Sequence, residues 1–406
     1  MRRRSVLAGF VALIGLAAAA APRAQTPAPR VVAIGDIHGS LDGVTAILRS
    51  TGLTGSDGRW TGGATTFVQT GDVTDRGAGV RAVFDLLRRL GPEAEAAGGR
   101  VVPVLGNHEV MNLIGEVRDV TPEIFASFAG ADADKTRDAA WRAYNDLVAR
   151  RARDRRGEQP LGLTRTKEAF LAAYPRGAVE YRRALGPDGD YGRWLRSLPV
   201  AVKVERTVFM HAGAPPDTTE DLDAVNARAR GEVQRMDRFL SRLVSAGLAA
   251  PWFRLEDTLA VAAAEVRWVN AQVARAKERG ERPALDGVDI ELVQEAADIL
   301  KVGEWSLLKG DGPLWYRGWA TLDDAAIDVP LDTLLARLGA DRLVVGHTVN
   351  RDFRIRARLA GRLFLIDTGM LSSVYKGVPS ALELTNGRAR AYYAGGRTDD
   401  LAPGRR

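Results

Sequence analysis

The sequence predicts an α/β fold, because short apolar runs typical of buried strands alternate with amphipathic helical patterns. A glycine follows each of these runs within a few residues, where the strand would end. The runs lie at residues 31–34, 65–68, 101–105, 207–210, 342–345 and 363–366. Their continuous apolar character predicts strands that are covered on both faces. Helical spacing of apolar residues follows the first two runs, for example at residues 80–87.

Two longer segments interrupt this alternation, at about residues 115–200 and 217–310. Both are rich in Ala, Arg and Glu with helical spacing, and we interpret them as mainly helical insertions that form a cap on the α/β core. Residues 30–395 are therefore expected to form a single domain that carries these insertions. The tail at residues 397–406 is expected to be disordered.

The N-terminus has the pattern of a targeting segment. Three arginines precede an uninterrupted run of apolar and small residues at 6–21, which is short for a membrane span. Small residues at 18–20 offer a cleavage site, so residues 1–24 are interpreted as a signal peptide. The pair Arg3-Arg4 resembles a twin-arginine signal, while an ordinary secretory leader and an uncleaved anchor remain alternatives. We expect an exported, periplasmic protein with no stable membrane span after cleavage.

Charge and cysteine content exclude several function classes. The formal net charge is +6, but five arginines precede the first acidic residue, and the rest of the chain is nearly balanced. The chain therefore gives no reason to expect a nucleic-acid surface. Cysteine is absent from all 406 residues, which excludes disulfides, thiolate metal sites and a phosphocysteine mechanism.

The four histidines indicate where the chemistry lies. Each follows an apolar run directly or within four residues, inside a glycine-containing turn: His38, His108, His211 and His347. Loops at strand ends are where α/β proteins build their sites. A single histidine is more often structural, but four in the same situation point to a shared site.

Neighbouring residues supply oxygen ligands. Asp36 lies two residues before His38, Asp72 and Asp75 share one loop with Arg76, and Asn107 precedes a histidine. A set of Asp, Asn and His suits Mn, Fe or Zn better than Ca or Mg.

In order, these motifs resemble those of the metallophosphoesterases, and within them the phosphoprotein phosphatases. The strings are GDxHG at 35–39, GDxxDRG at 71–77, GNHE at 106–109, and later histidines beside a glycine or an alanine. Segments 311–318 and 367–370 are similar to the Shewanella-like branch. The resemblance implies a metallophosphoesterase-type β-sandwich flanked by helices, an αββα arrangement, with the helical insertions forming a cap.

The resemblance also implies two metal ions, which are Mn, Fe or Zn with Mn favoured. Six residues would hold them: Asp36, His38, Asp72, Asn107, His211 and His347. The first three would bind one ion and the last three the other, and Asp72 would bridge to the second. Arg76 and Arg317 would bind the phosphate oxygens, and His108, oriented by Asp75, would be the general acid.

The implied function is a metal-dependent phosphomonoester hydrolase that acts on phosphoproteins. A metal-bridging hydroxide would attack the phosphate directly. Phosphoserine or phosphothreonine and phosphotyrosine are both open as substrates, and Trp315, Tyr316 and Trp319 either flank an aryl group or pack in the core. One alternative is a hydrolase of small phosphoesters or dinucleoside polyphosphates, and another is a non-catalytic metal- or phosphate-binding protein. The family's usual valine is replaced by Thr74, which is expected to contact no proposed ligand.

Overall fold

The computed structural model describes residues 29–154, 163 and 165–401 and contains two β-sheets. The predicted signal peptide lies outside the described residues. The first sheet has the order β11-β10-β9-β1-β2-β3, and the second has the order β4-β5-β6-β8-β7. The strands of the first sheet are β1 (Arg30–Ile34), β2 (Thr66–Gln69), β3 (Arg100–Pro103), β9 (Ser380–Thr385), β10 (Arg388–Tyr393) and β11 (Thr398–Leu401). Those of the second are β4 (Ala201–Val204), β5 (Thr207–Met210), β6 (Arg342–Val345), β7 (Arg356–Arg358) and β8 (Leu363–Leu365).

Alternating side chains of the central strands point into different apolar layers, as the two-residue period of a strand requires. Val31 of β1 and Phe209 of β5 belong to one buried cluster, which therefore lies between the two sheets. Val32 of β1 belongs to the cluster on the outer face of the first sheet. Val208 of β5 belongs to the cluster on the outer face of the second sheet. All six predicted strands are thus present. Strands β1 and β5 are covered on both faces, whereas the edge strand β3 is only partly buried.

Helices cover both outer faces. Helices α1 (Leu41–Ser50) and α2 (Val80–Ala96) contribute to the cluster on the first sheet, and α13 (Asp324–Leu338) contributes to the cluster on the second. The predicted αββα arrangement is confirmed. The short helices α12 (Gly318–Thr321) and α14 (Ser372–Tyr375) and the 3₁₀ turns Val302–Glu304 and Leu359–Gly361 lie in loops.

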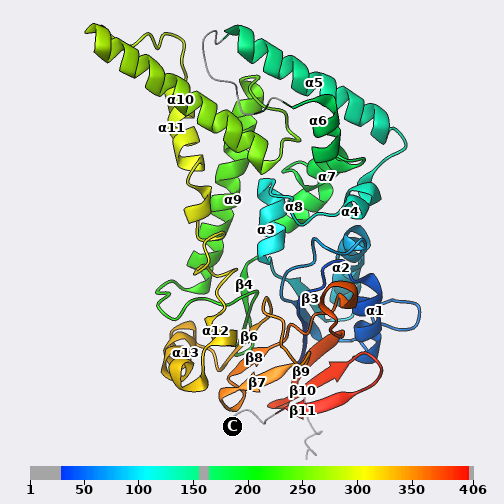
Figure 1. Ribbon diagram of the computed structural model, residues 1–406. Coiled ribbons are helices and arrows are strands. Elements are labelled where there is room, and N and C mark those ends of the chain that lie inside the picture. Colours follow the sequence, from blue (N-terminus) through cyan, green and yellow to red (C-terminus); the bar gives the residue numbers. More distant parts are fainter. Residues whose placement is uncertain (1–28, 155–162, 164, 402–406) are drawn as a thin grey trace, which may run out of the picture.

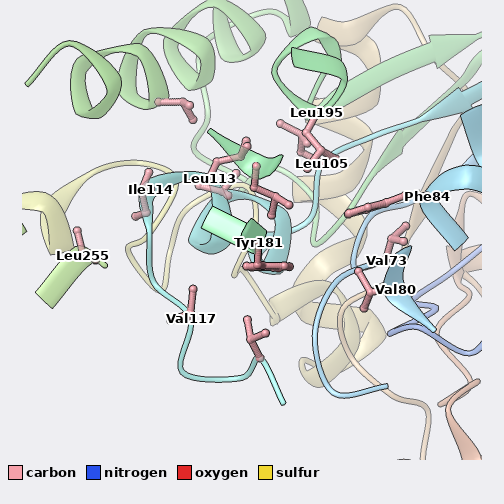
Figure 2. Packing of buried hydrophobic residues seen from close by; sticks show 14 of the residues in the cluster. Val73, Val80, Phe84, Leu105, Leu113, Ile114, Val117, Tyr181, Leu195 and Leu255 are labelled. Atoms are coloured by element: carbon pink, nitrogen blue, oxygen red, sulfur yellow. The ribbon is translucent and has the colours of Figure 1, made fainter. Parts of the chain in front are cut away.

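The cap consists of helices from the two long segments (Figure 1). The first segment supplies α4 (Pro122–Phe128), α5 (Ala133–Asp154), α6 (Lys167–Ala173), α7 (Ala178–Leu185) and α8 (Asp190–Ser197). The second supplies α9 (Leu222–Ser245), α10 (Leu255–Arg279) and α11 (Ile290–Ile299). Helix α3 (Asn107–Ile114) lies between the sheets and the cap, and Figure 2 shows its Leu113 in one cluster with Tyr181 of α7. The cap therefore packs directly on the helix that opens with the GNHE motif.

The expectation of a disordered tail is wrong in part. Residues 398–401 form β11, which pairs antiparallel with β10, and Arg390 contacts Asp400 across the pair at 2.7 Å. Residues 402–406 lie outside the described part of the chain. Within the described ranges, no helix combines the length and apolar character needed to cross a membrane.

Candidate metal centre

Nine of the ten predicted site residues follow the carboxyl ends of parallel strands in the two sheets, and Arg317 instead directly precedes the short helix α12. Strands β1, β2 and β3 run parallel to one another, as do β5, β6 and β8. Ligands placed just beyond such strand ends converge in the crevice there. Close packing leaves no room for a side chain at several glycines of these turns; for example, a Cβ at Gly106 would lie 2.1 Å from Asp72 Oδ1. Only glycine fits at that position.

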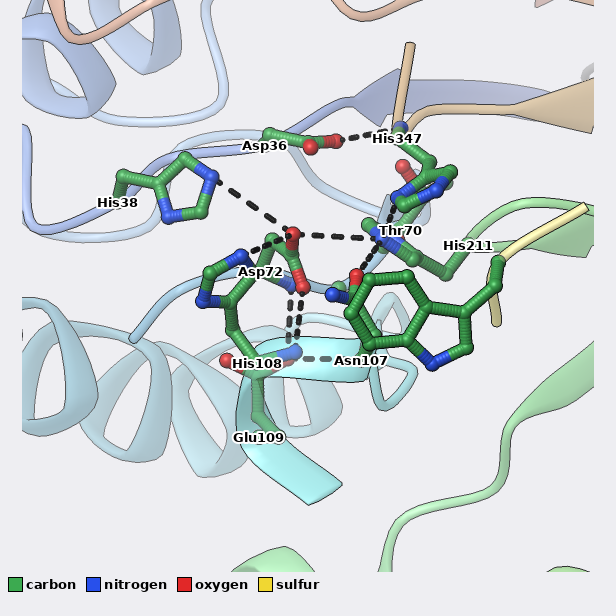
Figure 3. Close-up of polar contacts among 12 residues, drawn as sticks. Asp36, His38, Thr70, Asp72, Asn107, His108, Glu109, His211 and His347 are labelled. Atoms are coloured by element: carbon green, nitrogen blue, oxygen red, sulfur yellow. Dashed lines mark hydrogen bonds and ion pairs between the residues drawn. The ribbon is translucent and has the colours of Figure 1, made fainter. Parts of the chain in front are cut away.

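Asp72 lies at the centre of the site (Figure 3). Its Oδ2 is 3.3 Å from His211 Nε2, 3.6 Å from His38 Nε2 and 3.8 Å from His108 Nε2. Burial alone would raise the pKa of the Asp72 carboxyl, but His211 and His108 outweigh it and hold this pKa well below the ordinary value. Asp72 is therefore an anion that faces three imidazoles.

The first group of possible metal ligands contains His38 and Asp72, together with His108. His38 Nδ1 donates to the carbonyl of Thr74 at 2.8 Å, which directs Nε2 toward Asp72. Burial lowers the pKa of His38 to about 3, so its imidazole is neutral and can act as a ligand.

The second group contains Asp72, His211 and His347. His211 Nε2 lies 2.8 Å from Asn107 Oδ1 and 3.0 Å from His347 Nδ1, and its Nδ1 donates to the Thr70 carbonyl at 2.9 Å. A carbonyl partner on the far nitrogen of a ligating histidine is typical of metal sites. Against the opposing effect of burial, Asp72 and Asp36 raise the pKa of His211 to about 10.

Asp36 lies beside the second group rather than within either one. Its Oδ1 accepts a hydrogen bond from the His347 backbone at 3.0 Å. Burial and the neighbouring Asp367 raise its pKa well above the ordinary value, and burial raises the pKa of Asp367 to about 6. Sequence reasoning missed Asp367 as part of the site, although it begins the segment 367–370 that carries the family resemblance.

The residues present fit divalent metal ions. Three buried carboxylates and three imidazoles converge where only nitrogen and oxygen donors are available: Asp36, Asp72, Asp367, His38, His211 and His347. The Nε2 atom of His347 is also buried without a hydrogen-bond partner. Buried carboxylates in such numbers are costly unless a cation compensates them. A borderline metal such as Mn, Fe or Zn suits this donor set.

Glu109 organises the loop that carries Asp72. Its Oε2 accepts from the backbone nitrogens of Asp72 at 2.7 Å and Gly106 at 2.8 Å, and its Oε1 accepts from those of Val73 and Thr74 at 2.8 and 2.9 Å. The Thr74 hydroxyl donates to the same Oε1 at 2.9 Å. The expectation that Thr74 contacts no proposed ligand is wrong, because its carbonyl accepts from His38. Its hydroxyl gives the buried carboxylate a donor that valine lacks.

His108 and Asp75 form a closely paired acid and base. His108 Nδ1 lies 2.5 Å from Asp75 Oδ2, and both residues are buried. Burial would lower the pKa of His108, but Asp72 and Asp75 together raise it above the ordinary value. The imidazole is thus suited to carry a proton on the side that faces the metal groups.

Two arginines lie at the site. Arg76 Nη1 lies 2.7 Å from His38 Nε2 and also donates to the Tyr375 hydroxyl. Arg317 is exposed, and its Nη1 donates to the His347 carbonyl at 3.1 Å and the Thr348 hydroxyl at 3.0 Å. Tyr375 comes from α14 and had no sequence signal. All ten predicted site residues thus belong to one connected cluster, although their individual roles remain predictions.

The aromatic residues near Arg317 divide between two environments. Trp319 is fully buried in the core of the second sheet, where its indole donates to the Ala214 carbonyl at 2.9 Å. Trp315 is partly buried, and its ring centroid lies 5.8 Å from that of His347. Core packing is therefore the role of Trp319, whereas Trp315 borders the site.

A model of a known family matches most of the chain. The family model described as calcineurin-like phosphoesterase matches residues 29–351, a range that includes all ten predicted site residues. The chain belongs to the calcineurin-like phosphoesterase family.

Three individual relatives show moderate to low sequence identity to this phosphoesterase. The chain is 29% identical to an uncharacterised protein of Schizosaccharomyces pombe over 87% of this chain and 77% of that protein. It is 32% identical to Shewanella-like protein phosphatase 2 of Arabidopsis thaliana over 55% of this chain and 57% of that protein. The crystal structure of a cold-active protein-tyrosine phosphatase of a psychrophilic Shewanella species shares the fold, with a TM-score of 0.51 and 23% identity over 92% of this chain and 80% of that one.

The backbone of the phosphoesterase centre is strained at several site residues. Five of them have positive φ although none is glycine: His38 at 44°, Asp72 at 58°, Asp75 at 71°, Arg76 at 68° and His347 at 65°. Side chains other than glycine rarely adopt this region, and residues held there cluster at functional sites. The hydrogen bonds of Glu109 and Thr74 are what hold the Asp72 loop in this conformation.

Proposed function

We propose that this phosphoesterase removes phosphate from phosphoproteins with two bound divalent ions, manganese being the favoured metal. The observation that carries the proposal is the position of Asp72 Oδ2, within 3.8 Å of imidazoles from both groups of possible ligands. With its carboxylate between the two ligand groups, Asp72 could be shared by two bound ions. The similarity to a Shewanella-like protein phosphatase supports a phosphoprotein as the substrate.

The protein residues would perform three tasks. Arg76 and Arg317 would bind the phosphate oxygens with planar guanidinium groups, which suit bidentate contacts. His108, held by Asp75, would donate its proton to the leaving oxygen of the substrate. When bound, the ions would supply an activated water and positive charge for the attacking and leaving oxygens.

Aryl phosphates such as phosphotyrosine fit the surroundings of the centre. Tyr375 and Trp315 place rings 5.7 Å from His38 and 5.8 Å from His347, respectively. His38 and His347 lie on opposite sides of Asp72 in Figure 3. Aromatic side chains on two sides of the phosphate site favour an aromatic leaving group.

The test is a direct comparison of substrates with the manganese-loaded chain. We expect kcat/KM to be higher for a phosphotyrosine peptide than for a phosphoserine peptide of the same sequence, and lowest for a dinucleoside polyphosphate. A preference for the dinucleoside polyphosphate would overturn the phosphoprotein proposal. Metal binding without turnover of any of the three would instead favour a binding protein.

We also propose that the protein is exported to the periplasm. The support is the arginine-rich start of the chain and the apolar run at residues 6–21. The twin-arginine route, which carries folded proteins, suits an enzyme that would acquire its metals before export.

A further inference from the structure

The carboxylate of Asp75 is held from two sides. Its Oδ2 lies 2.5 Å from His108 Nδ1, and its Oδ1 accepts a hydrogen bond from Asn112 Nδ2 at 2.9 Å. Asn112 is fully buried one turn after His108 on α3, and the same amide nitrogen donates to the His108 carbonyl at 2.9 Å. Asn112 therefore fixes which oxygen of Asp75 faces the imidazole.

The orientation of the Asn112 amide depends in turn on the cap. The hydroxyl of Tyr181, from α7, donates to Asn112 Oδ1 at 2.7 Å. Burial and the nearby Asp75 raise the pKa of Tyr181 well above its ordinary value, so the hydroxyl keeps its proton. A proton donor at Oδ1 turns the amide nitrogen toward Asp75, whereas the flipped amide would point an oxygen at a carboxylate.

Tyr181 itself has little freedom. Its ring is fully buried and makes edge contacts with Phe125 and Phe128 at centroid distances of 5.3 and 4.9 Å. The next residue, Arg182, donates to the Asn112 carbonyl at 2.7 Å near the end of α3. Two consecutive cap residues thus contact the same asparagine, and the ring of Tyr181 is also part of the buried hydrophobic cluster drawn in Figure 2.

We propose that Tyr181 and Asn112 are positioning residues for the His108–Asp75 pair, so that the helical cap takes part in protonating the leaving group. The inference rests on the proposed role of His108 and extends it to a residue of the first insertion. Neither residue would touch the substrate. Each acts by holding the Asp75 carboxylate in the geometry that His108 requires.

The experiment compares leaving groups in the manganese-loaded full chain. Tyr181→Phe keeps the packed ring and removes only the hydroxyl, and Asn112→Ala removes the amide. We expect kcat for a phosphoserine peptide to fall about 10-fold in Tyr181→Phe and further in Asn112→Ala, which is less than the loss of about 10²–10⁴-fold expected when the general acid itself is removed. An aryl phosphate with a good leaving group should keep kcat within about 2-fold, because it needs little protonation. KM and metal content should not change.

The matched control is Tyr191→Phe, which removes another cap hydroxyl that donates to Asp85 at 2.6 Å, outside the site network. It should leave both substrates unaffected. A purely structural role for Tyr181 would lower kcat equally for both leaving groups, and that result would overturn the inference. No effect in either variant would overturn it as well.

His108→Asn distinguishes a failure of the positioning inference from a failure of the proposed role of His108. If His108→Asn shows the leaving-group dependence and the Tyr181 and Asn112 variants do not, the positioning inference fails and the proposed acid stands. If His108→Asn shows none, the proposed role of His108 fails and the inference fails with it. Should Asn112→Ala unfold, Tyr181→Phe alone decides, since it preserves the volume of the core.

Discussion

Oδ2 of Asp72 lies 3.3 Å from Nε2 of His211 and 3.6 Å from Nε2 of His38, so a single carboxylate oxygen faces both ligand groups. We expect Asp72→Asn to lower kcat/KM more than Asp36→Asn, because only Asp72 is placed to serve both ions. Prolonged chelation should abolish activity, and added manganese should restore it. Elemental analysis beside the assay checks this. Full activity in a verified metal-free preparation would rule out the two-metal mechanism.

His108 is expected to matter most for poor leaving groups. His108→Asn should lower kcat by about 10²–10⁴-fold on a phosphoserine peptide, since the leaving alkoxide then departs without a proton. An aryl phosphate with a good leaving group should suffer less, and metal content should be preserved. The measurement is kcat on both substrates together with elemental analysis. Equal losses on the two would show that His108 does not protonate the leaving oxygen.

Arg317 is exposed, and its contacts with the His347 carbonyl and Thr348 place it at the edge of the centre. Arg317→Lys should be nearly as harmful to kcat/KM as Arg317→Ala, because lysine keeps the charge but not the bidentate fork. Inhibition by inorganic phosphate should weaken in parallel, while metal content stays constant. Arg337→Ala, at an exposed position on α13, is the control. Unchanged phosphate inhibition in Arg317→Ala would remove this residue from the site.

Glu109 should be more important for folding than any other residue of the GNHE motif. Glu109→Gln replaces one acceptor oxygen with a donor that faces backbone N–H groups, and hydrogen bonds to a charged group contribute about 1.5–3 kcal/mol each. We expect a clear fall in the melting temperature and in metal affinity together. Thermal unfolding with and without manganese measures both. Glu95→Gln, exposed on α2, should have no effect. Equal stability of the two variants would show that Glu109 does not hold the Asp72 loop.

Export is tested on the whole chain. Changing Arg3 and Arg4 to lysine together should block a route for folded proteins and spare the general secretory route. The readout is the amount of mature protein in the periplasmic fraction. An unchanged amount would reject the twin-arginine assignment and leave export itself standing.

The central strands and the site residues in the motifs could be predicted from the sequence, because both depend on local patterns. Apolar runs such as 342–345 mark strands buried on both faces, and glycine turns after them carry the polar side chains. Strands β10 and β11 were missed for the opposite reason. Strand β11 is the short edge strand of the first sheet, and β10 lies beside it. Both carry charged residues on an exposed face, and their pairing includes contacts such as Arg390 to Asp400.

No sequence pattern identified the residues that support the site through contacts with other site residues. Tyr181 comes from the cap and Tyr375 from a four-residue helix, and only the tertiary fold brings them to Asn112 and Arg76. Thr74 was misjudged because the hydrogen bond between its carbonyl and His38 joins two motifs that are separate in the sequence. Sequence motifs predict which side chains form a site, but only the three-dimensional structure shows the hydrogen bonds that hold its loops.

The left-handed backbone of Asp72, Asp75 and the neighbouring Arg76 has a consequence for how far the chain can be stabilised. Each such residue costs on the order of 1–3 kcal/mol, which glycine at the same position would largely recover. A functional enzyme cannot gain this stability by substituting glycine, because glycine has no carboxylate or guanidinium to serve the site. The Asp72 loop is therefore a place where activity and thermal robustness oppose each other, and improvements in robustness have to come from the cap and the outer helices.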